Sequence, residues 1–459
     1  MIRPRHIVLF VVSTLAAGCA RPDAKEPAVA VVAVVAGEPI YASDFVMNYE
    51  LGFPHLRQGE NPGLSYLQRV IDEKLLAMEG HRRGLIEDEA IRRRVTNLRE
   101  ALLVEQVFHR YVNDRITVND KDIEMAMQRD RVAFKLRYLP ATSLERARDQ
   151  RALADRVGFE EVAADFAASH RDVSIGPEDL QSPYVSWRDI SPTLLSAIQD
   201  LPLGAISEPV RYNGHYLLLQ VMDVRRDPVA PVSAAERSRY EQIVFQQKAR
   251  STAREFIGSM MKPLGVRIKA PIYASLRNGL WTWYQDAPPR ENLLRALSGI
   301  GAGYADSIRS VLDDVLVTTN EGDWTVRRFL EEFPVERYPL RYRRTEDFEN
   351  DLYDAVGLTL RDKYFVQRAE REGLDDAEDV RHEMNLWLDK WTFRALVDDV
   401  EESGESIEDV LGALRDRYAV EIHHEVLDTL GLSDAGSAGL TLLKGHTMRP
   451  AFPIVDAGF

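Results

Sequence analysis

The stretch that decides the fold of the central part of this chain is Leu201-Pro202-Leu203-Gly204-Ala205-Ile206-Ser207-Glu208-Pro209-Val210. It is followed by Gly214 and by an apolar run, 215–221, that has the pattern of a closing β-strand. Three earlier segments have the patterns of one strand and two helices, in this order: 132–139, 159–168 and 192–199. The order strand, helix, helix, strand predicts an α+β domain over residues 131–226.

This region resembles the parvulin-type peptidyl-prolyl isomerase domain. The decapeptide is close to the Leu-x-x-Gly-x-Ile/Val-Ser-x-Pro-Val run of that family, and Phe159-Glu160-Glu161-Val162-Ala163-Ala164-Asp165-Phe166 matches its helix of the Phe-x-x-x-Ala type. With a helical segment and a Gly-Glu-Pro-Ile turn in front of it, the chain is similar to the envelope chaperones of the SurA/PrsA family. The resemblance implies a helical chaperone module into which the α+β domain is inserted.

The same resemblance assigns the site residues. Active parvulins carry one histidine in the first strand and one in the last, and these positions fall on Tyr138 and Tyr216. The family's Cys/Asp position falls near Val173, with Asp172 adjacent. The pocket for the prolyl ring is implied at two apolar positions of this chain, Ile190 and Leu194.

Replacement of both histidines weakens the inference of catalysis without excluding it. Isomerisation breaks no bond, so a catalyst must favour the twisted amide over the planar one against a barrier of ~18–20 kcal/mol. An apolar cleft that binds the planar and the twisted prolyl bond equally well provides affinity but does not accelerate isomerisation. Tyrosine hydroxyls at 138 and 216 still offer hydrogen bonds. His215, one residue from the motif, is expected on the other sheet face in a solvated or packing role.

The N-terminus predicts export. Arg3 and Arg5 precede a short apolar run that ends in Leu15-Ala16-Ala17-Gly18-Cys19, which is too short to span a bilayer and has the layout of a secretory signal. The segment resembles a bacterial lipoprotein signal, which implies an acyl chain on Cys19 after cleavage, and Ala20 favours sorting to the outer membrane. The alternative is an ordinary secretory signal with an incidental cysteine.

Helical periodicity dominates the flanking parts of the chain. Residues 31–35 are expected to form a strand, Ser43 and Asp44 to cap a first helix, and two amphipathic helices to meet near Gly84. The stripe of the second of these helices is Ile91, Val95, Leu98 and Leu102. A long helix over 234–261 is expected to pack on this N-terminal domain.

A repeat follows the long helix. Aligned without gaps, Lys74 pairs with Lys363 and Gly84 with Gly373, and the apolar faces of the helices match as well. The alignment predicts a diverged second copy of the helical module; the alternative is that any two amphipathic helices align passably. The expected divisions are a signal peptide (1–18), a lipidated tether (19–30), an N-terminal helical domain (31–130), a parvulin-like domain (131–226), a returning long helix (227–275), a second helical module (276–431) and a loosely ordered tail (432–459).

Composition limits the other possibilities. The chain has 459 residues, one cysteine and a formal net charge of -15. One cysteine cannot form an internal disulfide, and the acidic balance disfavours a nucleic-acid binder. The histidines, including His423 and His424, show no metal-ligand spacing, so neither a metal nor a cofactor is expected.

The sequence therefore predicts a mainly helical α+β protein that acts as a lipid-anchored chaperone or foldase of the cell envelope. Its expected partners are unfolded secreted or outer-membrane proteins and, through the anchor, the membrane. Two alternatives stay open: a catalytically active prolyl isomerase, and a non-catalytic scaffold subunit of an envelope complex.

Overall fold

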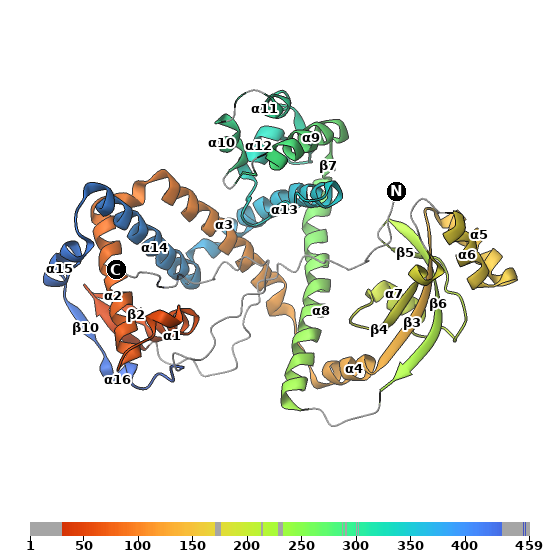
Figure 1. The fold of residues 1–459 in the computed structure, drawn as a ribbon, viewed down its shortest axis with the longest axis horizontal. Coiled ribbons are helices and arrows are strands. Elements are labelled where there is room, and N and C mark those ends of the chain that lie inside the picture. Colours follow the sequence, from red (N-terminus) through yellow and green to blue (C-terminus); the bar gives the residue numbers. More distant parts are fainter. Residues whose placement is uncertain are drawn as a thin grey trace. The chain divides into compact units, whose positions relative to one another are not determined.

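The computed structural model confirms a mainly helical α+β chain (Figure 1). It describes residues 30–169, 176–212, 214–227, 233–286, 288–289, 292–299, 301, 303–433, 453 and 455. The expected signal peptide, Cys19, Asp172 and Val173 lie outside these residues. Among them, no helix combines the length and apolar character that crossing a membrane requires. The described chain divides into a first unit, Arg115–Thr252, and a second unit that joins 30–114 to the residues from Ala253 onward.

The first unit is built on a four-stranded antiparallel sheet with the strand order β4-β3-β6-β5. Its strands are β3 (Val132–Ala141), β4 (Gln181–Ser186), β5 (Val210–Tyr212) and β6 (His215–Arg226). Its helices are α4 (Asp120–Asp130), α5 (Leu144–Val157), α6 (Phe159–Ser169) and α7 (Pro192–Ile198). The four elements predicted within 131–226 are confirmed, whereas β4, β5 and α5 have no predicted counterpart.

The two faces of this sheet carry separate buried clusters, because successive residues of a strand point to opposite faces. Leu139 and Leu218 pack with Phe159 and Val162 of α6. Leu136, Leu217, Leu219 and Val221 pack on the other face with Ile190 and with Ile198 of α7. We call this second set the α7-side cluster.

Helix α8 (Ala234–Met261) follows the predicted bounds and contributes residues to both units. In the first unit, the Tyr240 hydroxyl donates to Asp130 of α4 at 2.6 Å, and Lys248 bonds Asp122 of α4 at 2.7 Å. These contacts hold α4 against α8 within the first unit, which begins at Arg115. In the second unit, the ring of Phe256 stacks on Tyr111, with centroids 4.9 Å apart.

The second unit contains two small three-stranded sheets, with the orders β10-β1-β2 and β7-β8-β9. The strands are β1 (Val31–Val35), β2 (Glu38–Tyr41), β7 (Arg267–Ile268), β8 (Val315–Thr318), β9 (Trp324–Thr325) and β10 (Val420–Ile422). The helices are α1 (Ala42–Leu51), α2 (Pro62–Arg82), α3 (Glu89–Tyr111), α9 (Ala270–Asp286), α10 (Leu293–Ser298), α11 (Tyr304–Arg309), α12 (Val326–Glu332), α13 (Thr345–Arg371), α14 (Glu378–Ser403), α15 (Ile407–Arg417) and α16 (His424–Leu427).

The predicted repeat has the same local structure in both copies. Gly84 and Gly373 both have left-handed backbone angles, with φ of 79° and 67°. Each is followed by a 3-10 turn, Leu85–Glu87 or Leu374–Asp376, and then by the next long helix. Every one of these bounds is related by the same offset along the chain. A left-handed residue after a helix is what glycine provides at little steric cost, which explains the repeated Gly-Leu ending.

The two copies are not separate modules, because each packs its helices on those of the other. Helix α2 of the first copy lies against α14 of the second, and α13 of the second lies against α3 of the first (Figure 1). Strand β10 pairs with β1, with Ala33 opposite Ile422. One buried core of the second unit therefore combines residues that are far apart in the sequence, such as Leu75 and Leu396.

One further expectation is corrected in this unit. Tyr41 precedes α1 and caps it with no side-chain bond, so Ser43 and Asp44 lie inside the first turn. Most of the predicted tail lies outside the described residues. Of those described, Ser433 is held by Glu50, and Val455 is 2% exposed and packs in the buried core that contains Leu75 and Leu396.

Candidate functional site

The residues predicted for an isomerase site lie in the first unit, and the sheet register separates the two tyrosines. Tyr138 on β3 is opposite Leu219 on β6, whereas Tyr216 is opposite Ala141. Directly opposed residues share a sheet face, and Leu219 belongs to the α7-side cluster. The side chain of Tyr138 therefore lies on the α7 side, while Tyr216 is on the opposite face. The structure does not bring the predicted pair together.

The surroundings of Tyr138 are partly those predicted. Ile190, which is buried, and Leu194, which is half-buried, pack in the α7-side cluster. Tyr138 packs against this cluster and also touches the cluster on the α6 side. The Tyr138 hydroxyl donates to the main-chain oxygen of Asp179 at 2.7 Å. Burial, together with the charge of Asp179, raises the pKa of Tyr138 above its ordinary value. The hydroxyl is thus a neutral donor that already has an acceptor.

His215 lies at the other end of the same face. It pairs with Tyr212 across the β5–β6 ladder, and Tyr212 packs against the α7-side cluster. His215 itself is exposed to solvent, as predicted for the residue next to the motif. The α7 side of the sheet therefore offers apolar surface, the engaged hydroxyl of Tyr138 and, at its far end, Tyr212 and the exposed His215.

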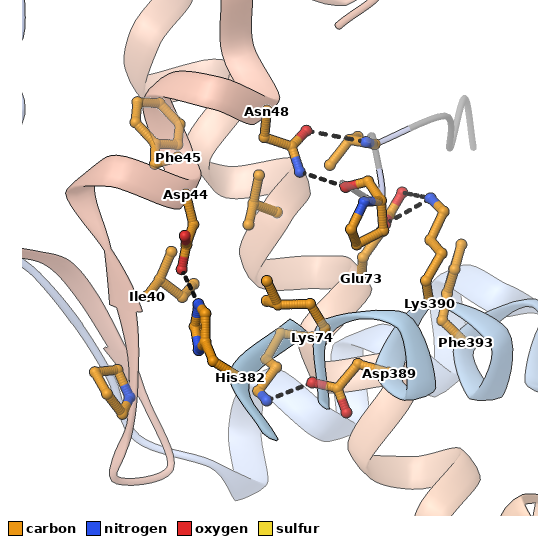
Figure 2. Close-up of a pocket in the computed structure, with 15 residues that line it drawn as sticks. Ile40, Asp44, Phe45, Asn48, Glu73, Lys74, His382, Asp389, Lys390 and Phe393 are labelled. Atoms are coloured by element: carbon orange, nitrogen blue, oxygen red, sulfur yellow. Dashed lines mark hydrogen bonds and ion pairs between the residues drawn. The ribbon is translucent and has the colours of Figure 1, made fainter. Parts of the chain in front are cut away.

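A pocket in the second unit was not predicted (Figure 2). It has a volume of about 100 Å³ and lies among β2, α1, α2 and α14. Its apolar lining comes from both copies of the repeat and from two residues near the end of the chain: Pro39, Ile40, Phe45, Val70, Leu386, Phe393, Pro453 and Val455. Since α14 belongs to the second copy, the pocket forms where helices of the two copies pack against each other.

Ion pairs line the polar part of this pocket. Lys390 of α14 binds Glu73 of α2 at 2.9 and 3.1 Å, with both side chains buried. Lys74 binds Asp389 at 2.6 Å, and His382 lies 2.8 Å from Asp44. Lys390 and Lys74 thus each face a carboxylate on another element, which offsets the cost of removing their charges from water.

Neighbouring charges also shift two of these groups. Burial opposes ionisation of Asp389, but the hydrogen bond with His81 and the charge of Lys74 hold its pKa below the ordinary value. Burial likewise disfavours the charged form of Lys74, but Asp389 and Glu38 outweigh it and raise the Lys74 pKa. Both groups are therefore charged at neutral pH and keep α2 and α14 joined at the pocket rim.

Asn48, like Asp44, lines the pocket from α1, and its side chain binds main-chain groups. Its Nδ2 donates to the main-chain oxygen of Pro453 at 2.8 Å, and its Oδ1 accepts the N–H of Val455 at 3.0 Å (Figure 2). The Tyr66 hydroxyl donates to the same Oδ1 at 2.8 Å and orients the amide. Asn48 is only 7% exposed, and leaving such an amide unpaired would cost about 1–3 kcal/mol.

No local sequence pattern predicts this pocket. Asn48 is one polar residue in an amphipathic helix, and its partners lie at the far end of the chain. The repeat alignment singled out Lys74 but did not reveal that its partner would be Asp389 in the other copy. Among the residues that the structure describes, no group of three or more His, Cys, Asp or Glu side chains is placed to hold a metal ion.

Comparisons with known proteins find resemblance only among solved structures. No family model and no curated protein matches the chain. A SurA-like chaperone of Campylobacter jejuni is 15% identical, with a TM-score of 0.23, and the alignment covers 51% of this chain and 97% of the other. The peptidylprolyl isomerase PrsA of Bacillus anthracis is 14% identical, with a TM-score of 0.23 and coverages of 41% and 96%. The foldase protein PrsA of Streptococcus pneumoniae is 11% identical, with a TM-score of 0.26 and coverages of 52% and 96%.

Proposed function

We propose that this chain is an envelope lipoprotein chaperone of the SurA/PrsA type that binds unfolded secreted or outer-membrane proteins. In this proposal the parvulin-like unit recognises prolyl segments and has lost most or all of its isomerase activity. The observation that carries it is that Tyr138 and Tyr216 lie on two faces of the sheet, while Ile190 and Leu194 lie together in the apolar α7-side cluster.

The separation matters because catalysis and binding make different demands. Lowering a barrier of ~18–20 kcal/mol needs polar groups that act together on one amide in its twisted state. Of the two predicted tyrosines, only Tyr138 faces the α7-side cluster, and its hydroxyl donates to the main-chain oxygen of Asp179. An apolar surface has no such requirement, so Ile190 and Leu194 can still hold a prolyl or other apolar side chain.

Location and anchoring belong to the proposal as well. They rest on Arg3, Arg5 and the Gly18-Cys19 pair, from which we infer export, acylation of Cys19 and an outer-membrane anchor facing the periplasm. A mass measurement on protein extracted from membranes tests this part separately, and an unmodified Cys19 would contradict it.

Two assays on the purified chain test the function. We expect a stoichiometric amount to delay aggregation of an unfolded client, and we expect no more than a slight acceleration of a proline-limited refolding reaction. Leu194→Ser should weaken the delay because it removes apolar surface from the half-buried edge of the cluster. The matched control is Tyr353→Phe, at a position that is 58% exposed in the other unit.

Each alternative gives a different result in these assays. Strong acceleration of refolding that is lost in Tyr138→Phe would show a working isomerase. Failure to delay aggregation would contradict the chaperone proposal. Capture of one stable, stoichiometric partner, together with that failure, would favour a scaffold subunit.

A further inference from the structure

The pocket around Asn48 has the features of a site that binds an extended peptide through its main chain. Asn48 contacts the C=O of Pro453 and the N–H of Val455, which are two residues apart. In an extended chain these two groups point to the same edge, where a neighbouring parallel strand would bind both through one residue. The amide of Asn48 has one donor and one acceptor in that arrangement, so it acts as one residue of such a strand.

Recognition by this amide does not depend on sequence, and the apolar part of the pocket adds a preference. Val455 is 2% exposed and belongs to the same buried core as Phe45 and Phe393. Main-chain bonds give affinity in strand-like peptide binding, and pockets for alternate side chains give selectivity. The site therefore suits an extended segment that places an apolar side chain of the size of valine or larger two residues after the bonded carbonyl.

The site keeps space beside its present occupant. A volume of about 100 Å³ stays open with Val455 in place, and it is bordered by apolar side chains and by the ion pairs of α2 and α14. Val455 thus does not fill the pocket, which leaves room for a larger apolar side chain from another peptide.

We propose that this pocket is a client-binding site, and that the segment containing Pro453 and Val455 occupies it as an internal competitor. The inference rests on the proposed function in one respect, namely that the clients are unfolded polypeptides. The competing segment is covalently joined to the chain at Ser433, which Glu50 and Tyr49 hold beside the same helix α1. A tethered segment has an effective concentration on the order of millimolar, so a client segment must displace it in order to bind.

Peptide binding to the full chain tests the competition. The probe is a fluorescent peptide with the sequence of residues 451–459, and its affinity is measured by anisotropy. Val455→Asp puts a charge where a buried apolar side chain was, so it should release the internal segment and tighten binding of the probe by about tenfold or more. A probe with Asp at the position of Val455 should bind to neither protein.

The role of Asn48 is tested in the released background. Asn48→Asp replaces the Nδ2 donor by an oxygen that repels the peptide carbonyl, so Asn48→Asp/Val455→Asp should lose the gain. The matched control is Met47→Asp/Val455→Asp, because Met47 is the neighbouring residue on α1 and is 44% exposed; it should keep the gain. Equal binding by the parent chain and Val455→Asp, or no effect of Asn48→Asp, would overturn the proposal.

A measurement on the unmodified chain covers the case in which a variant fails to fold. The amide hydrogen of Val455 should exchange slowly, because Asn48 accepts it in a buried place. Excess unlabelled peptide should accelerate that exchange. Fast exchange without peptide would refute the internal occupancy. If Val455→Asp binds the probe tightly but delays client aggregation no better than the parent chain, the peptide site stands and the chaperone function fails.

Discussion

Glu383 on α14 is a carboxyl group in surroundings that disfavour its charge. Burial and the negative charges of Glu105 and Asp379 raise its pKa to about 7, and a hydrogen bond with Trp387 only partly offsets them. The folded protein therefore holds this proton more tightly than the unfolded chain does. The stabilisation from this group is fully present below the ordinary pKa of 4.5 and is lost as the pH rises through about 7.

Glu383→Gln should remove this pH dependence, because glutamine is neutral at every pH. We expect the free energy of unfolding to rise by about 1–3 kcal/mol at pH 8 and to stay close to the parent value at pH 4.5. Urea unfolding at both pH values measures the difference. Asp398→Asn, at an exposed position on the same helix, is the control and should change little at either pH. A variant less stable than the parent at pH 8 would show that the carboxylate is needed there.

At the scale of the elements, the two copies of the repeat are joined by equivalent ion pairs. Lys74 binds Asp389 between α2 and α14, and Lys363 binds Glu100 between α13 and α3. The four positions are related by the same offset that relates Gly84 to Gly373. A second pair of related contacts has its charges reversed, since Arg83 binds Asp399 whereas Glu372 lies 3.8 Å from Arg110. The positions, rather than the residue types, are what the two copies share.

The α2–α14 contact depends on a glycine. A Cβ atom added to Gly80 would lie 2.6 Å from the side chain of Thr392 and 2.9 Å from its main-chain oxygen. A side chain can turn away, but the carbonyl can yield only if the helices separate. Gly80 therefore sets how closely these helices approach, and with it the shape of the pocket that they line.

Gly80→Ala should lower the free energy of unfolding by about 1–3 kcal/mol through overpacking, although alanine is the better helix former. The matched variant is Gly357→Ala on α13, where an added Cβ meets nothing within 4 Å. This second change should stabilise the chain by up to about 1 kcal/mol. Thermal or urea unfolding of both variants checks the signs. The same sign for both would mean that the Thr392 contact does not limit the packing.

At the scale of the whole molecule, the sequence predicted what depends on neighbouring residues. Periodicity located β1 and α8 at their observed bounds, and the repeat was visible as an alignment without gaps. The sequence did not reveal that α2 packs on α14 of the other copy, because helices of either copy could cover the apolar face of α2. The sheet face of Tyr216 was missed for a related reason: it follows from the register of β3 and β6, which pairs Tyr216 with Ala141 and Tyr138 with Leu219. Register and partner choice are set by the folded chain as a whole.

Because helices of the two copies pack on each other, residues that are far apart in the sequence share one buried core. Leu75 and Leu76 of α2 share a buried cluster with Leu396 and Val400 of α14, and β10 completes the sheet begun by β1. Neither copy buries its apolar faces alone. Residues 30–114 should therefore unfold together with the last part of the second unit, although most of the chain lies between them.

Leu396→Ala tests this cooperativity, because Leu396 is fully buried in the shared core. Its truncation should cost about 2–5 kcal/mol and should accelerate amide hydrogen exchange in α2 as much as in α14. The protected amides of β3, in the other unit, serve as the internal control and should exchange at the parent rate. Faster exchange in α14 with an unchanged α2 would mean that the first copy is stable without the second. In that case the Asn48 pocket would lose its α14 wall while α1 and α2 stayed folded, so the pocket would open before the unit unfolds.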